Sequence, residues 1–487
     1  MAAPPCCKQL EHDDFQCMVE YTKAERPFLT RAFGAMGTGS LRGCTVSLIF
    51  SAVGAGILSL PWAIARLGLV VGIGALLASA VFSYATMEML IVSGLDRKKL
   101  DYAGTLSDIL GPRGADLVNL VVIIDSAGAI CVFYVYMADS IRAVAVAFGY
   151  DFQASLIIVA MSFGTVLPLS LPEQITALQR FAVASLVPLI FVISLVVLRC
   201  PFLTSWAKLN RVLVRADLMS IEAAQACSAI FFSYMCHMNV WSVRNELHRP
   251  TERRTSKVFR RAVGVLFLLY TLFGIAGSLS FADATPSDIL QAYPASDRTN
   301  LCAHLLMALM LIVCSVLCVH PVRNSLACLF GLQGTILSKQ SLSVPHSPLR
   351  SYISSPKLSS ADMADMDCSL GPECSEEART PSSDLACALL PDAGEELISS
   401  ACSRYTLTLA IISVTCTVAI AVPSVVQLLG ILGGFCGVVL MFVLPTFIYA
   451  QTRTGVRSLV AIALASIFSV VGLVAAVGSV MPASKTP

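Results

Sequence analysis

The sequence predicts an all-α, multi-pass membrane protein with eleven transmembrane helices. Hydrophobic residues make up 56% of the 487 residues and charged residues only 13%, whereas about a quarter of the residues of a soluble protein are charged. Long uncharged runs recur along the chain, and a spanning helix needs roughly 20 mostly apolar residues. We expect spans at about 43–65, 68–93, 117–148, 153–170, 181–199, 220–243, 260–282, 300–330, 405–422, 427–450 and 457–481.

These spans divide the chain into membrane and non-membrane parts. Residues 1–41 are polar and lack the apolar core of a signal peptide, so we expect a cytoplasmic tail. Helices one to eight fill 42–333 and helices nine to eleven fill 404–481, followed by a short tail at 482–487. Residues 334–403 are rich in Ser and Pro and cannot bury enough apolar surface to fold, which predicts a disordered cytoplasmic loop.

Three Ser-Pro or Thr-Pro pairs in that loop suit a proline-directed kinase, at Ser347, Ser355 and Thr380. The alternative is an unregulated linker.

Lys and Arg in the short loops set the orientation, because cytoplasmic loops carry an excess of both. Loops 94–116, 244–261 and 451–457 are basic, whereas 149–154 and 283–298 carry only Arg298. Although 199–219 disagrees, the majority places the N-terminus in the cytoplasm and, with an odd number of spans, the C-terminus outside. The basic residues are therefore topology signals and indicate no nucleic-acid partner. We expect the plasma membrane, with a vacuolar or lysosome-like membrane as the alternative.

The first span contains helix breakers, in 51-SAVGAGILSLP-61. Gly54 and Gly56 each weaken a helix by about 1 kcal/mol relative to Ala, and Pro61 removes the donor that would bond to Ile57. Exposed backbone is tolerated in hydrocarbon only where it lines a protein-enclosed cavity. The stretch therefore indicates either a close helix contact or a binding site.

The sixth span, 228-SAIFFSYMCHMNVWSV-243, is also interrupted by polar residues, namely Ser233, Tyr234, His237 and Asn239. Two sets of five spans, each opening with an interrupted helix, form the inverted-repeat arrangement of secondary transporters. An eleventh helix follows. This interpretation rests on the positions of the spans alone.

At these two segments the chain resembles the amino acid/auxin permease family. The motifs that carry the resemblance are Gly54-Ala55-Gly56-Ile57-Leu58-Ser59-Leu60-Pro61, then His237, Asn239, Glu246-Leu247 and Pro250-Thr251, then 269-LYTLFGIAGSLSFADATPSDIL-290, and Pro321-x-Arg323. The resemblance covers spans one to eight closely and nine to eleven loosely. The combined motifs are specific to the family, but not to one substrate.

The resemblance implies alternating-access transport of amino acids, with the substrate at the breaks of spans one and six. A half-helix that begins after Gly54 would present unpaired N–H groups and a positive dipole end to a carboxylate. We therefore expect the carboxylate at Gly54, Ala55, Gly56 and Ile57, and a facing wall of Phe232, Ser233, Tyr234 and Cys236.

Further polar residues lie within the third span. An acid inside the membrane indicates function by default, so Asp125 would bind a cationic side chain or carry a proton; the alternative is a hydrated position near the interface. We expect Asp139 to pair with Arg142 near the outer surface. If the span packs as in this family, Tyr134 donates its hydroxyl to the substrate; otherwise it is an aromatic anchor.

The candidates for ion coupling are Asp125, His237, Ser51 and Ser315. Histidine titrates in the physiological range, but the family motif allows a neutral residue at His237, which favours a structural role. In the sodium-coupled branch of the family an Asn stands where this chain has Phe50, leaving Ser51 and Ser315 as oxygen donors for a cation. Proton coupling or facilitated exchange is therefore favoured over sodium symport.

Two other functions deserve comparison with a transporter. An amino-acid sensor would use the same site and signal through the tail and the long loop, without measurable flux. No HExxH pattern, facing catalytic aspartates or Ser/His arrangement appears, so we expect no enzymatic activity, no cofactor and no metal. Asp125 favours a cationic substrate, while a small neutral amino acid suits the glycines equally well.

Overall fold

A computed structural model describes residues 39–54, 56–171, 186–200, 219–294, 296–330, 390–422 and 424–480, with only the backbone for 390–402. The N-terminal tail up to residue 38, most of the predicted loop 334–403 and the C-terminal tail lie outside the described residues. So do the three kinase-type positions, Ser347, Ser355 and Thr380.

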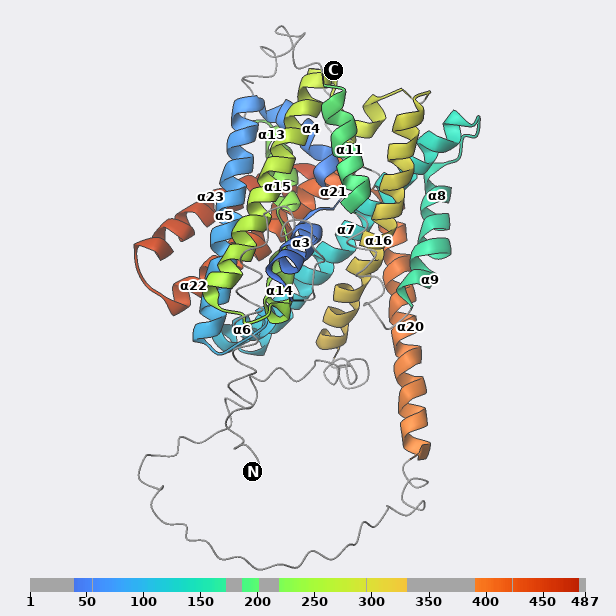
Figure 1. Ribbon diagram of the computed structural model, residues 1–487. Coiled ribbons are helices and arrows are strands. Elements are labelled where there is room, and N and C mark those ends of the chain that lie inside the picture. The colour runs from blue at the N-terminus through green and yellow to red at the C-terminus, as the bar shows by residue number, and fades with distance from the viewer. Residues whose placement is uncertain are drawn as a thin grey trace, which may run out of the picture.

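The described chain is mainly helical (Figure 1), and each predicted span overlaps at least one described helix. The first half contains α3 (Leu41–Ala52), α4 (Gly56–Leu67), α5 (Leu69–Asp96), α6 (Tyr102–Leu110), α7 (Pro112–Ala147), α8 (Ala154–Met161), the π-helix η1 (Ser162–Val166), α9 (Leu167–Ser170) and α11 (Leu186–Leu198). The second half contains α13 (Ile221–Ser233), η2 (His237–Asn239), α14 (Val240–Glu246), α15 (Glu252–Phe281), η3 (Ala282–Ala284), η4 (Ile289–Ala292), α16 (Arg298–Leu329), α20 (Leu390–Ala421), α21 (Val425–Ile431), the π-helix η5 (Leu432–Val443), α22 (Leu444–Thr452) and α23 (Val456–Val480).

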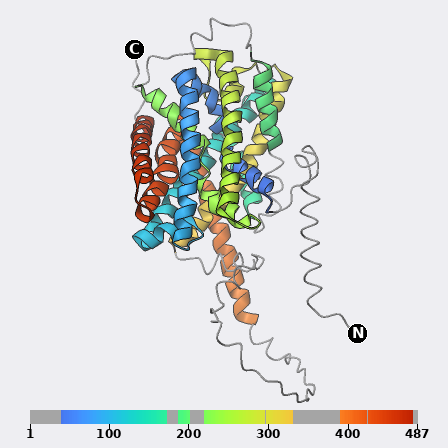
Figure 2. The same ribbon diagram turned by 60° about the vertical axis from the view of Figure 1, so that its left-hand side comes forward.

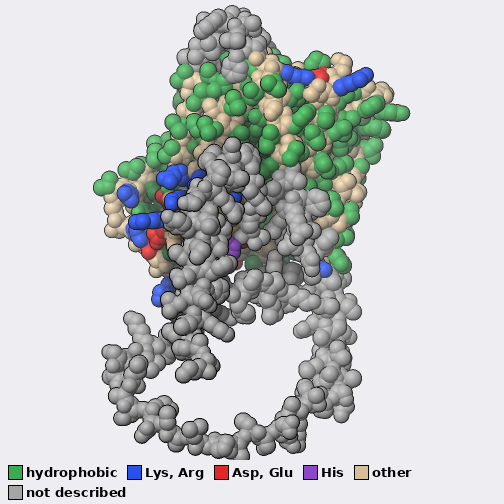
Figure 3. Space-filling model, in the orientation of Figure 1, with side chains coloured by type: hydrophobic (Ala, Val, Ile, Leu, Met, Phe, Trp, Pro, Cys, Tyr) green, Lys and Arg blue, Asp and Glu red, His purple; other side chains and the backbone are tan. Residues whose placement is uncertain are grey.

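The protein is an integral membrane protein. Seven helices of the described chain are long and apolar enough to span a bilayer, and eight are if α3 and α4 count as one bent span. Two shorter apolar stretches, Ala154–Ser170 and Leu186–Leu198, accompany them. Hydrophobic side chains cover most of the visible body, while Lys and Arg gather near its two ends (Figure 3). This distribution is typical of a surface that faces lipid between two aqueous sides.

The first predicted span is broken, but not at its proline. Helices α3 and α4 meet at 64°, and the backbone leaves helical geometry at Val53 and Gly54. Pro61 lies buried inside α4, where it packs against α15: a Cβ added to Gly277 would lie 2.6 Å from the Pro61 ring. The glycine segment therefore makes the break, and Pro61 serves close helix packing.

The last helix, α23, lies at the periphery of the bundle (Figure 2) and packs on η5 through small residues. Large apolar side chains on its other face, such as Val470 and Leu473, are more than 60% exposed. Small residues at an interface let membrane helices approach closely, and a Cβ on Gly472 would collide with the carbonyl oxygen of Gly434. The buried stripe consists of Ser458, Ala461, Ala465, Gly472, Ala475 and Ser479.

Two helices extend into regions expected to be loops. Helix α6 lies in the predicted loop 94–116, is capped by Asp101, whose carboxylate accepts from Gly104 N, and is tied to η5 because Tyr102 donates to Leu440 O at 2.9 Å. Helix α20 begins at Leu390, within the predicted loop 334–403, and extends beyond the bundle (Figures 1 and 2).

The close contact of α23 with η5 should contribute to the stability of the folded protein. Gly472→Val should destabilise the protein by about 1–3 kcal/mol, because overpacking a tight contact costs that much. Gly264→Val in α15 is the matched control, since nothing lies within 4 Å of a Cβ at that glycine. Thermal unfolding of the purified protein in detergent measures both. Equal midpoints for the two variants would contradict the close packing.

Candidate functional site

The second break lies between α13 and α14. Helix α13 ends at Ser233, and Tyr234, Met235 and Cys236 lead into η2 without α-helical structure. Tyr270 of α15 donates its hydroxyl to Ser233 O at 2.8 Å, which satisfies a carbonyl that the helix end has freed. The Tyr270 ring also packs edge-on against Tyr234, with centroids 5.2 Å apart. Side chains of α15 and of the break itself thus stabilise this interruption in the protein interior.

The two breaks face each other. A Cβ added to Gly56, the first residue of α4, would lie 2.8 Å from Ser233 Oγ and 3.1 Å from the Phe232 ring. A Cβ on Gly54 would lie 3.4 Å from the ring of Phe133 in α7. The positive end of the α4 dipole therefore meets the negative end of the α13 dipole. Of the predicted carboxylate site, Gly54, Gly56 and Ile57 lie here, while Ala55 lies outside the described residues.

The predicted facing wall divides into two parts. Phe232 and Ser233 contact Gly56. The Cys236 thiol instead points to α5, where its sulfur lies 3.7 Å from the sulfur of Met87. The hydroxyl of Tyr234 is buried and has no hydrogen-bond partner among the described residues. Only the first two side chains are in direct contact with the glycine break.

Asp125 is buried rather than hydrated, with 3% of its surface exposed, and Oδ1 has no partner in the described part of the chain. From α7 it approaches Cys318 of α16 and Cys436 of η5. Eight residues of helix separate it from Phe133, or roughly 12 Å along the axis at 1.5 Å per residue. The structure therefore does not bring Asp125 to the breaks.

Tyr134 and Tyr136 of α7 reach different neighbours. Tyr134 shares a face of α7 with Cys131, whose thiol donates to Thr415 O of α20. Tyr136 instead reaches α4, where its hydroxyl lies 2.5 Å from Ser59 Oγ, and it lies 3.3 Å from Ser287 O of the loop before α16. Sequence reasoning missed Tyr136, Ser59 and Phe133, although a Tyr two residues after another was a visible signal.

His237 is completely buried in η2. Its Nε2 lies 3.0 Å from Thr86 Oγ1, and that hydroxyl is 2.9 Å from Phe82 O, to which it donates its one proton. Nε2 therefore carries the hydrogen and donates to Thr86, whereas Nδ1 has no partner among the described residues. The bond ties the second break to α5, which agrees with the structural role expected for this histidine.

The two serines considered for a cation each bond to their own helix. Ser51 donates to Leu48 O and Ser315 to Leu311 O, both at 2.8 Å. Among the described residues no group of three His, Cys, Asp or Glu side chains could hold a metal ion.

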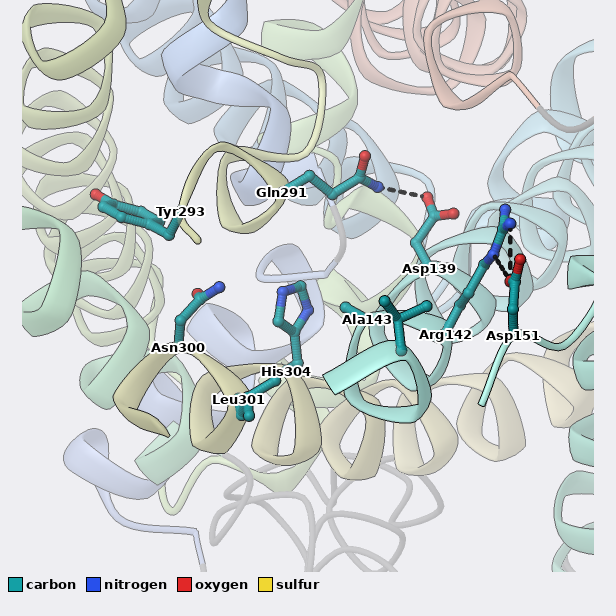
Figure 4. Close-up of a pocket in the computed structure, with 10 residues that line it drawn as sticks. Asp139, Arg142, Ala143, Asp151, Gln291, Tyr293, Asn300, Leu301 and His304 are labelled. Carbon is teal, nitrogen blue, oxygen red and sulfur yellow. Dashed lines mark hydrogen bonds and ion pairs between the residues drawn. The ribbon is translucent and has the colours of Figure 1, made fainter. Parts of the chain in front are cut away.

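A separate cavity of about 320 Å³ lies toward the predicted outer face. Asp139 Oδ2 accepts from the Gln291 amide at 2.8 Å, and Arg142 pairs with Asp151 at 3.0 Å (Figure 4). The expected pairing of Asp139 with Arg142 is therefore wrong, because Asp151 from the following loop takes the guanidinium. Behind the cavity, burial and then the charge of Asp139 raise the pKa of Asp288 from 3.8 to about 7.

Comparison with known families agrees with this architecture. The family model described as "Transmembrane amino acid transporter protein" matches residues 37–484. The chain belongs to this transmembrane amino acid transporter family. It is a family of transporters rather than of enzymes, in line with the absence of a catalytic pattern in the sequence.

Two relatives are called putative amino acid transporter AAT1. That of Toxoplasma gondii is 28% identical over 63% of this chain and 43% of its own length. That of Plasmodium berghei is 24% identical over 94% of this chain and 73% of its own length. Solute carrier family 38 member 10 of Homo sapiens is 26% identical over 53% of this chain, and the match spans 24% of the human protein. This chain thus matches less than half the length of the Toxoplasma and human relatives.

Solved structures also align with the chain. The structure of MhsT in complex with L-phenylalanine aligns over 90% of this chain and 98% of that chain, with 10% identity and a TM-score of 0.46. The manganese transporter of Eremococcus coleocola aligns over 90% of this chain and 86% of that chain, with 12% identity and a TM-score of 0.45. At these values the likeness carries no conclusion.

The edge-on pair Tyr270 and Tyr234 tests whether the Tyr270 hydroxyl satisfies the Ser233 carbonyl at the second break. Tyr270→Phe should destabilise the protein by about 1–3 kcal/mol, because it leaves the buried Ser233 carbonyl without its donor. Tyr234→Phe is the matched control, since that hydroxyl has no partner in the described chain. Unfolding midpoints measured without substrate compare the two. A loss for Tyr234→Phe that equals the loss for Tyr270→Phe would overturn the assignment.

Proposed function

We propose that the protein transports amino acids across a membrane by alternating access, with the substrate between the breaks of the first and sixth spans. The observation that carries the proposal is the approach of Gly56 to Ser233, which sets the N-terminus of α4 against the C-terminus of α13. A zwitterion is complementary to two opposed helix ends. Its carboxylate is attracted to the positive N-terminus of one helix and its ammonium group to the negative C-terminus of the other.

The roles of the individual residues follow from this arrangement. The unpaired N–H groups of Gly56 and Ile57, with Gly54 and Ala55, receive the carboxylate. The ammonium lies toward the end of α13 at Ser233 and Tyr234, and the rings of Phe133 and Phe232 cover the sides. Glycine at position 56 admits the head group where any side chain would meet Ser233.

Protons are the coupling ion that the buried groups favour, with facilitated exchange as the alternative. Asp125 is an unpartnered carboxyl inside the membrane span, and such a group can take up and release a proton as its surroundings open and close. His237 already donates to Thr86 and holds the break in place. Sodium is less favoured, because Phe50 stands where the sodium-coupled branch of the family has an Asn, and it offers no oxygen.

The complete topology belongs to the same proposal. It comprises eleven spans as a five-plus-five inverted repeat and a final helix, with the N-terminus in the cytoplasm and the C-terminus outside. The plasma membrane is the expected location, and a lysosome-like membrane the alternative. A sensor that signals through residues 1–41 and 334–403, with kinase control at Ser347, Ser355 and Thr380, remains the second hypothesis; no described contact favours it.

Gly56→Leu tests the binding site. This variant should lose more than nine tenths of the saturable uptake of radiolabelled amino acids, because the new side chain would collide with Ser233 and Phe232 and close the break to a substrate. Gly74→Leu in α5 is the control and should keep normal uptake, since a Cβ there meets nothing within 4 Å. Surface expression of both is measured in parallel. Normal uptake by Gly56→Leu would show that the glycine serves packing only.

Asp125→Asn tests the coupling. Wild-type uptake should rise from pH 7.5 to pH 5.5 and be indifferent to sodium, and the variant should lose this pH dependence because an amide cannot carry the proton. Asp116→Asn, an exposed acid on the same helix, is the control. Acid-stimulated uptake that survives in Asp125→Asn would assign the coupling to another group.

A further inference from the structure

The outer cavity is built from three separate segments of the chain. Asp139 and Arg142 come from the last turns of α7, Gln291 from the end of η4, and Asn300 and His304 from the first turns of α16 (Figure 4). It is a pocket between helices rather than a feature of one helix end, and its 320 Å³ can hold a small molecule.

The charges that line this cavity do not cancel. Arg142 is paired with Asp151, while the half-buried Asp139 has a neutral partner, the amide of Gln291. No described ion pair supplies Asp139 with a cation. Behind it, burial and the charge of Asp139 raise the pKa of Asp288 from 3.8 to about 7, so Asp288 adds no cation to the cavity either. The cavity therefore carries a net negative charge.

Asn300 adds a side-chain oxygen that accepts no hydrogen bond from the described residues. Its side chain is 1% exposed, and its Nδ2 donates to Leu290 O at 3.2 Å, which fixes the orientation of the amide. Oδ1 then has no partner among the described residues. An unsatisfied buried acceptor is destabilising. Asn300 lies on the other side of His304 from Asp139 (Figure 4), so a second donor of the ligand, apart from the group at Asp139, would satisfy it.

Helix α7 also offers a positive side chain, Arg142, for a negative group of the ligand. Asp139 and Arg142 are three residues apart and therefore neighbours on one helix face. Arg142 faces Asp151, whose side chain is 69% exposed, and an exposed ion pair of this kind contributes little to stability. A ligand carboxylate can therefore replace Asp151 at little cost.

We propose that this outer cavity is a separate recognition subsite for the head group of an α-amino acid. The ammonium binds the Asp139 carboxylate, and the carboxylate binds Arg142 in place of Asp151. The subsite lies on the way to the breaks: Tyr136, one turn along α7 from Asp139, contacts Ser59 of α4. The assignment rests on the proposed transport of amino acids.

Binding measurements on the full-length protein in detergent test the subsite. L-Alanine and L-lysine, both radiolabelled, are used on Gly56→Leu, in which the site at the breaks is blocked. Saturable binding should persist in that protein. Adding Asp139→Asn should weaken it at least tenfold, and adding Ala143→Trp, which fills the cavity without changing its charge, should abolish it. Adding Asp116→Asn should leave it unchanged, and a monodisperse elution profile confirms folding of each variant.

The outcomes separate this subsite from the transport proposal. Binding that is absent in Gly56→Leu, or unaffected by both cavity variants, overturns the subsite even if the wild type transports amino acids. If instead the wild type transports none, while Gly56→Leu binds alanine or lysine through Asp139, the subsite stands and the transport proposal falls.

Discussion

The arrangement of the whole bundle depends on one constraint: backbone groups that leave a helix inside the membrane must be satisfied by the protein itself. Two spans are interrupted at the same level, and the approach of Gly56 to Ser233 brings the interruptions together. Tyr270 then satisfies the freed carbonyl of Ser233, and His237 fastens the second break to Thr86. The first N–H groups of α4 have no partner within their own helix, and in the proposed function they bind the substrate carboxylate.

The sequence predicted the membrane class and its long apolar helices, because hydropathy over some 20 residues depends only on neighbours in the chain. Its motifs predicted the family. It predicted the glycine break for the same local reason. It could not place Pro61, since the role of this proline inside α4 depends on its packing against Gly277, more than two hundred residues away.

Long-range contacts account for the other differences. Tyr136 and Phe133, rather than Tyr134, approach α4, because the rotation of α7 about its axis is set by packing that the sequence does not reveal. Asp139 and Arg142 looked like a pair because they are three residues apart. The structure supplies Asp151 and Gln291 from two other segments, and only their convergence creates the outer cavity.

If Asp125 carries the coupling proton, as proposed, its distance from the breaks requires an element that links them. The π-helix η5 contacts both regions. Cys436 lies near Asp125, and Gly433 packs directly on the backbone of α13 at Ser228. A change in the charge of Asp125 would act on η5, which contacts the helix that ends at the substrate site. Coupling over this distance needs an element with two discrete arrangements, and a glycine-rich π-helix is suited to that role.

The central claim is that an amino acid lies between the opposed ends of α4 and α13. The most direct measurement is a cryo-EM structure of the full-length protein with the amino acid that it transports. The account predicts the substrate carboxylate within hydrogen-bonding distance of the N–H groups of Gly56 and Ile57, with the Phe133 and Phe232 rings beside it. Density for the substrate at another place, with Gly56 still packed against Ser233, would contradict the account.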